Sequence, residues 1–179
     1  MPRYVAFLRG MNLGGRRITN DQLVRCFEQM DLSPASAFLA SGNVLFDSSA
    51  RSRPKLEATI AKGLKAQLKY EVPTFIRSAA EVAAITDRQP FTPEVVAQTA
   101  GKLQVALLSA EPSAGARKKA LAHASASDHL AIVGRELYWL PKAGMSDSEL
   151  PVDQLAKHLG AMTIRTHRTI TRLAAKMDA

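Results

Sequence analysis

The stretch "RYVAFLRG" (residues 3–10) decides the fold expected for this chain. Its apolar run predicts a buried strand, which ends abruptly at Arg9 and Gly10. Residues 7–18, "FLRGMNLGGRRI", carry the chain out of this strand through three glycines, an asparagine and three arginines. Glycine tolerates backbone angles that other residues avoid and lets a ligand approach the backbone closely. The segment is therefore either a loop that holds an anion or a turn that needs glycine for its geometry.

The segments that follow complete a recognisable order of elements. Thr19 and Gln22 have the spacing of a capping box, which predicts a helix over about 20–30. Residues 37–48, "AFLASGNVLFDS", predict two short strands around a Ser-Gly-Asn turn. Ser52 and Pro54 open a second helix, and a strand over 70–78 follows, whose Pro73 favours a sheet edge. The order strand, helix, strand, strand, helix, strand is that of a ferredoxin-like unit.

The remaining residues repeat this order less regularly. We expect a helix over 79–87, a strand over 102–110, a helix over 113–123, a hairpin over 129–140, and helices over 151–159 and 166–177. The predicted fold class is α+β, with two packed ferredoxin-like halves and antiparallel sheets. The predicted domains are an N-terminal ferredoxin-like half, 1–78, and a C-terminal α/β half, 79–179.

Composition limits the classes of protein to consider. Hydrophobic residues make up 46% of the 179 residues, as in folded globular proteins. No apolar run approaches the length of a membrane span, and the N-terminal apolar stretch is too short for a signal peptide. The single cysteine, Cys26, excludes an internal disulfide, and its place near an apolar helical stripe favours packing. The four histidines lack metal-ligand spacing. We expect a soluble, cytoplasmic protein without a metal, a cofactor or a membrane partner.

The net charge of +8 is unevenly distributed. Residues 1–17 carry +4 and residues 160–179 carry +3, so the 142 residues between them carry only +1. If the fold brings the two ends together, they form a positive patch that attracts phosphates or carboxylates. Arg165, Arg168, Arg172 and Lys176 are spaced for one face of the terminal helix. A solubilising surface charge without a partner is the alternative.

The candidate ligand-binding residues follow from these patterns. The segment after the first strand would offer backbone donors and arginines, and the start of the next helix would favour an anion. The pattern matches neither a Walker loop nor the dinucleotide-binding fingerprint. The Ser-Gly-Asn turn adds small polar groups, and Thr163 and Arg165 would face the glycines across a shared cleft. The candidates are Arg9, Gly10, Asn12, Gly14, Gly15, Ser41, Asn43, Thr163 and Arg165.

Several of these stretches resemble one bacterial family, the domain of unknown function 1697 family. "YVAFLRGMNLGG" is similar to its opening signature, Leu-Arg-Gly-x-Asn-x-Gly-Gly after the first strand, and "SGNVLF" (41–46) matches its second. "VPTFIRSAAEVAAI" with "PF" (90–91), and "KLQVALLSAEP" (102–112), fit its middle. "TIRTHRT" (163–169) stands where the family has Thr-Thr-Arg-Asn-Trp-x-Thr, so Ile164, Thr166 and His167 depart from it. The resemblance implies two ferredoxin-like halves and no particular reaction.

Three functions remain open. The first is binding of an anionic, phosphate-bearing small molecule or nucleotide. The second is RNA binding on a ferredoxin-like sheet, which normally uses exposed aromatic residues on the central strands. Phe7 and Phe46 are the candidates for that role, and we expect both to be buried. The third is an enzyme acting on a phosphorylated small molecule, for which the sequence offers no recognisable nucleophile or base. The oligomeric state is not indicated.

Overall fold

The computed structural model describes residues 1–39 and 42–179. These residues form two compact units, one of residues 1–83 with 173–179 and one of residues 84–172. The chain passes from the first unit to the second within helix α3 (Ala79–Asp87) and returns within helix α7 (His167–Asp178). The first unit therefore includes the last residues of the chain, which the domains predicted from the sequence place in the second half.

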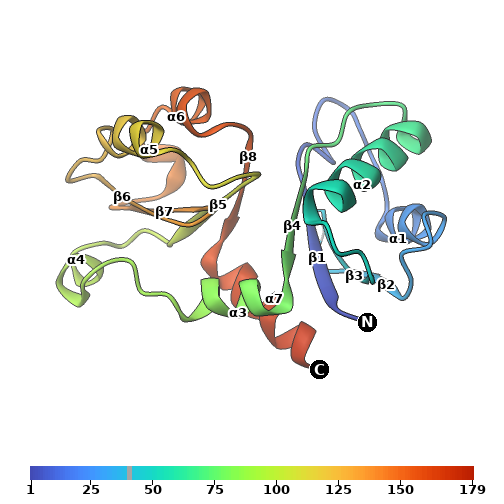
Figure 1. Ribbon diagram of the computed structural model, residues 1–179. Coiled ribbons are helices and arrows are strands. Elements are labelled where there is room, and N and C mark those ends of the chain that lie inside the picture. Colours follow the sequence, from blue (N-terminus) through green and yellow to red (C-terminus); the bar gives the residue numbers. More distant parts are fainter. Residues whose placement is uncertain (40–41) are drawn as a thin grey trace. The chain divides into compact units, whose positions relative to one another are not determined.

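The first unit is built on a four-stranded antiparallel sheet (Figure 1). Its strands lie in the order β2-β3-β1-β4, so the first strand in sequence is central and β4 is an edge. The edge position agrees with Pro73, which directly precedes β4. The elements are β1 (Arg3–Leu8), α1 (Asn20–Glu28), β2 (Ala35–Ala37), β3 (Asn43–Asp47), α2 (Arg53–Leu68) and β4 (Thr74–Ser78).

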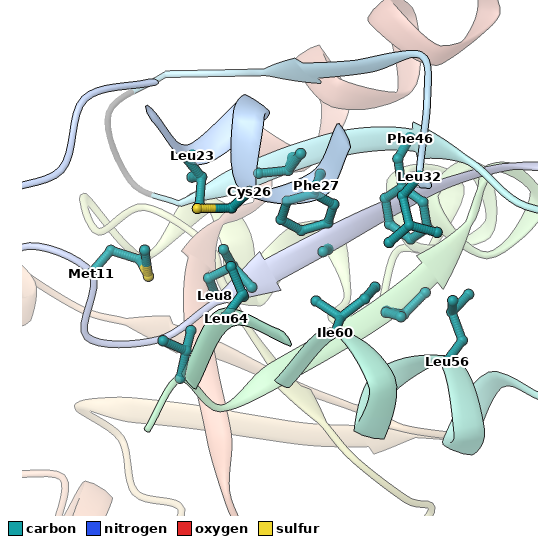
Figure 2. Packing of buried hydrophobic residues seen from close by; sticks show 14 residues of the cluster. Leu8, Met11, Leu23, Cys26, Phe27, Leu32, Phe46, Leu56, Ile60 and Leu64 are labelled. Carbon is teal, nitrogen blue, oxygen red and sulfur yellow. The ribbon is translucent and has the colours of Figure 1, made fainter. Parts of the chain in front are cut away.

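The core of this unit lies between the sheet and its two helices. Leu23, Cys26 and Phe27 of α1 meet Ile60 and other apolar residues of α2 over the sheet (Figure 2). Cys26 is buried within this cluster, as its position beside the apolar stripe predicts. Burial also raises the pKa of the Cys26 thiol. Packing is therefore the role that the structure gives to Cys26.

The second unit repeats the topology of the first. Its sheet has the order β6-β7-β5-β8, again antiparallel, and α5 and α6 cover one face (Figure 1). The second half is thus as regular as the first, which corrects the less regular arrangement expected from the sequence. The elements are α4 (Pro93–Ala97), β5 (Gln104–Leu108), α5 (Ala114–Leu121), β6 (Asp128–Val133), β7 (Glu136–Pro141), the 3-10 turn η1 (Met145–Asp147), α6 (Val152–Leu159) and β8 (Met162–Thr166).

The α+β fold with two ferredoxin-like halves is confirmed, and the differences concern single elements. Strand β8 was not expected, because the arginines around it are spaced as in a helix. In the structure Arg165 belongs to β8, where it lies opposite Val105 of β5, and α7 begins only at His167. The basic helical face therefore starts at Arg168, and Arg165 is not part of it. The short helix α4 was also missed. No described helix is long and apolar enough to cross a membrane.

Candidate functional site

The segment between β1 and α1, residues 9–17, is called the glycine loop here. It leaves the sheet beside two neighbouring segments. The N–H of Leu8 donates to the carbonyl of Gly42 (2.8 Å), and the N–H of Arg9 donates to the carbonyl of Pro73 (3.1 Å). Met11 is buried in the core of the first unit. The start of the loop is therefore fixed by hydrogen bonds on both sides and by one apolar anchor.

The rest of the glycine loop is exposed and needs its glycines. Gly10, Gly14 and Gly15 have φ angles of +74°, +59° and +81°, a region that other residues enter only with strain. A Cβ added to Gly14 or Gly15 would meet nothing within 4 Å, so open space lies beside their backbone. In the described part of the chain, the N–H groups of these two glycines have no hydrogen-bond partner. They are available to an acceptor that approaches from solvent.

Two arginines of the loop are held by contacts that leave their charge uncompensated. The guanidinium carbon of Arg16 lies 4.0 Å from the centre of the Tyr70 ring, a cation–π contact. Arg17 donates from Nη1 to the carbonyl of Arg16 at 2.8 Å. Among the described residues, no carboxylate lies within 4 Å of either guanidinium. The loop thus presents positive charge in a partly fixed geometry, which suits a bound anion.

The start of α1 is a poorer anion site than the sequence suggests. The Thr19 side chain accepts from the N–H of Gln22 (3.1 Å), and the Gln22 side chain accepts from the N–H of Thr19 (2.9 Å). This is the expected capping box. Asp21 adds a negative charge in the first turn. The capping box therefore occupies the N–H groups of Thr19 and Gln22, and Asp21 disfavours a second anion, so the stronger candidates for anion binding are the glycines and arginines before the helix.

The remaining candidates of the first unit differ in their surroundings. Asn12 is exposed on the glycine loop. Asn43 is fully buried at the start of β3, and its Nδ2 donates to the carbonyl of Phe38 at 3.0 Å. The Asn43 side chain therefore ties the start of β3 to Phe38, next to Gly42, whose carbonyl accepts from the N–H of Leu8. Ser41 lies outside the described residues.

Thr163 and Arg165 lie together on β8 in the second unit. Arg165 donates from Nη1 to the Thr163 hydroxyl (2.8 Å) and to the carbonyl of Ile164 (3.0 Å). Burial lowers the pKa of Arg165 to about 10, because the charged guanidinium is poorly solvated there. At neutral pH the group remains charged, and it would gain from contact with an anion. The side chain is oriented by its own strand.

The positive charge of residues 1–17 is divided between the two ends of β1. Arg3 donates from Nη1 to the carbonyl of Met177 at 3.5 Å, so the end of α7 meets the start of β1. Arg3 also pairs with Asp47 at 3.2 Å. Arg9 follows the opposite end of β1, six residues along the strand. The last turn of the chain therefore lies at the end of the first sheet away from the glycine loop, and Arg3 is neutralised locally.

Sequence reasoning missed two residues with a bearing on these sites. Tyr70 holds Arg16, although it lies far from the loop in sequence. Arg77 occupies on β4 the place that Arg165 occupies on β8. Arg77 lies opposite Val5 and donates to the carbonyl of Ile76 at 2.9 Å, and it is fully buried. The similar sequences "IRS" (76–78) and "IRT" (164–166) could have been used to predict both strand β8 and the equivalence of Arg77 and Arg165.

The described residues contain no group of three His, Cys, Asp or Glu side chains arranged to hold a metal ion. His123 and His158 stack with their ring centres 5.9 Å apart, without a third ligand of that kind among the described residues. Cys26, the one thiol, is buried in the core.

Two tandem ferredoxin-like units and a glycine loop after the first strand define an α+β protein of duplicated topology. The chain belongs to the DUF1697 family of proteins of unknown function, whose model matches residues 1–138. It is similar in structure to the conserved bacterial protein SP0830 from Streptococcus pneumoniae, with a TM-score of 0.72 and 17% sequence identity. The similarity covers 100% of this chain and 99% of the other, and at that identity it concerns the fold alone. The comparison with curated proteins found no significant match.

Proposed function

We propose that this protein binds an anionic, phosphate-bearing small molecule or nucleotide, and that the glycine loop of the first unit is the binding element. One observation carries the proposal. The exposed loop combines the unpartnered N–H groups of Gly14 and Gly15 with two guanidinium groups that no carboxylate neutralises within the described chain. Backbone N–H groups in such turns form concave sites for phosphate oxygens, and arginine adds charge-assisted hydrogen bonds.

The contacts within the loop indicate a separate role for each of its residues in binding. Met11 and the Arg9 N–H fix the start of the loop, and the N–H of Arg16 donates to the carbonyl of Leu13 (3.0 Å) across Gly14 and Gly15, so these glycines need little reordering when a ligand arrives. Arg16 is positioned in advance by Tyr70, and among the described residues the hydrogen bond of Arg17 is to the carbonyl of its neighbour Arg16. A phosphate group would accept from the glycine N–H groups and from Arg17, with Arg16 as the second cation. That Thr163 and Arg165 contribute to the same site stays a prediction from the sequence.

The test is isothermal titration with inorganic pyrophosphate and with ATP. Arg17→Ala removes a cation whose single intramolecular contact among the described residues is local, so folding should be unaffected. Loss of one charge-assisted hydrogen bond is worth about 1.5–3 kcal/mol, which raises Kd about tenfold or more. Arg51→Ala is the matched control, because Arg51 is also exposed and belongs to the same unit.

Two outcomes would contradict the proposal. The first is absence of saturable binding of either probe to the wild-type protein. The second is an equal loss of affinity in Arg17→Ala and Arg51→Ala, which would mean that only the net charge attracts the anions.

RNA binding has less support from the described residues. A ferredoxin-like sheet that binds RNA stacks bases on exposed aromatic side chains. Phe7 and Phe46, the aromatic residues of β1 and β3 considered for that role, are both buried, as expected. Retention of the protein on single-stranded RNA that falls steeply with salt would favour this alternative. Turnover of a phosphorylated metabolite would favour the third, enzymatic one.

A further inference from the structure

A cavity of about 590 Å³ lies within the second unit, whereas the glycine loop belongs to the first. Its walls come from Thr86 near the end of α3, from the segment that links α3 to β5, and from Leu140 of β7 and His167 at the start of α7. The volume is within the range of sites that hold small organic ligands. Such a cavity was not expected from the sequence, because its wall includes the short helix α4, which was not predicted, and the loops on either side of it.

The walls of this cavity are mostly apolar. Phe91, Val96, Leu103 and Leu140 contribute, and prolines before and after Phe91 stiffen the segment. Val96 is a large apolar residue with 50% of its surface exposed. Phe91 also lies against the ring of His129, with 6.2 Å between the ring centres. An apolar body of a ligand would bury surface here that the protein alone leaves in contact with water.

The charge in the walls is a single cation. Arg88 is the one lining residue with a formal charge, and no Asp or Glu is among the lining residues, all of which are described. His167 is already engaged, since its Nε2 donates to the carbonyl of Thr86 at 3.1 Å. The Thr86 hydroxyl is buried and has no hydrogen-bond partner within the described residues. Buried polar groups of this kind mark places where a water or a ligand completes the hydrogen bonding.

We infer that this cavity binds a small amphipathic carboxylic acid, with its apolar body against Phe91, Val96 and Leu103 and its carboxylate paired with Arg88. The single positive charge selects a monoanion. A phosphate monoester carries close to two negative charges at neutral pH, and the guanidinium of Arg88, the one charged group in the walls, compensates only one of them. The planar guanidinium matches a carboxylate in two parallel hydrogen bonds. This site and the glycine loop belong to different units and take different classes of anion.

The experiment is titration of the full chain with octanoate and 3-phenylpropionate, followed by calorimetry. Octanamide, which keeps the apolar body and lacks the charge, should bind at least about tenfold more weakly, as should octyl phosphate. Arg88→Gln should raise Kd for octanoate about tenfold, whereas Lys118→Gln, an exposed cation on α5 in the same unit, should leave it unchanged. Val96→Trp, which fills the cavity from an exposed position, should abolish binding with the far-UV circular dichroism retained.

Pyrophosphate binding by the glycine loop should not change in Arg88→Gln, so failure of one site is distinguishable from failure of the other. The inference is overturned if neither carboxylate binds saturably. It is also overturned if octanamide binds as tightly as octanoate, or if Lys118→Gln weakens binding as much as Arg88→Gln does. Tighter binding of octyl phosphate than of octanoate would overturn the assignment of a monoanion.

Discussion

Replacement of Gly42 by alanine should destabilise the protein through two separable effects. Gly42 has a φ angle of +76°, which costs a non-glycine residue about 1–2 kcal/mol. A Cβ at this position would also lie 2.8 Å from Cγ of Met11 and 3.2 Å from the carbonyl oxygen of Leu8. Because Met11 is buried and the Leu8 backbone belongs to β1, neither contact is relieved freely. Overpacking of this kind adds about 1–3 kcal/mol, so we expect a total of about 2–5 kcal/mol.

Gly14→Ala separates the two effects. Gly14 has a φ angle of +59°, yet a Cβ there meets nothing within 4 Å. Its cost should therefore be the backbone term alone, about 1–2 kcal/mol. The difference between the two variants measures the packing of Gly42 against Met11 and Leu8.

The assay is urea unfolding followed by far-UV circular dichroism, with the free energy compared at equal m-values. Equal destabilisation by the two substitutions would refute the reasoning, because it would show that Met11 and Leu8 make room for a methyl group at no cost. The start of the glycine loop would then not be fixed as the contacts indicate.

Three further predictions concern single side chains. Cys26→Ala should lower the free energy of unfolding, measured in urea, by about 1 kcal/mol and leave ligand binding intact. In the wild type, burial raises the pKa of the Cys26 thiol, so the thiol should react with iodoacetamide only when the protein unfolds. Asn43→Ala removes the Nδ2 donor that binds the Phe38 carbonyl, so it should cost about 0.5–1.5 kcal/mol of stability while the Kd for pyrophosphate stays unchanged; a selective loss of binding would make Asn43 a ligand-binding residue instead. Arg165→Gln should raise the Kd for pyrophosphate if Arg165 shares a binding site with the glycine loop, as the sequence predicts. An unchanged Kd would show that Arg165 does not contribute to pyrophosphate binding.

The sequence contained enough to predict the fold class, because the first unit obeys local rules. The capping box at Thr19 and Pro54 at the start of α2 mark helix ends that the structure reproduces. The apolar stripe of α1 faces the core as its spacing requires. These patterns involve residues that are close together in the chain, so local interactions alone are enough to form the predicted elements.

Strand β8 was not predicted because Arg165 has the spacing of a helical face relative to Arg168 and Arg172 of α7. The five residues of β8 run directly into that helix without a glycine or proline between them. Only comparison with "TFIRS" of β4, which runs directly into α3 in the same way, reveals the strand.

The candidate site was predicted in part. The glycines of the loop and its arginines could be proposed from the sequence because residue type alone indicates their chemistry, although Arg16 and Arg17 were not among the candidate residues and their anion binding stays a proposal. The contact of Arg16 with Tyr70 and the fully buried state of Asn43 depend on tertiary packing, which local patterns do not encode. The cavity beside Arg88 forms where the segment between α3 and β5 packs near Leu140 and His167, so no short sequence motif predicts it.

The most direct test of anion binding by the glycine loop is a proton–nitrogen NMR titration with inorganic pyrophosphate, because it observes the proposed donors themselves. The account predicts that the N–H resonances of Gly14 and Gly15 shift downfield and saturate together, as donors to phosphate oxygens do. The resonance of Gly115, in the first turn of α5, serves as the reference and should not move. Unshifted resonances of Gly14 and Gly15, or small unsaturable shifts shared equally with Gly115, would contradict the account.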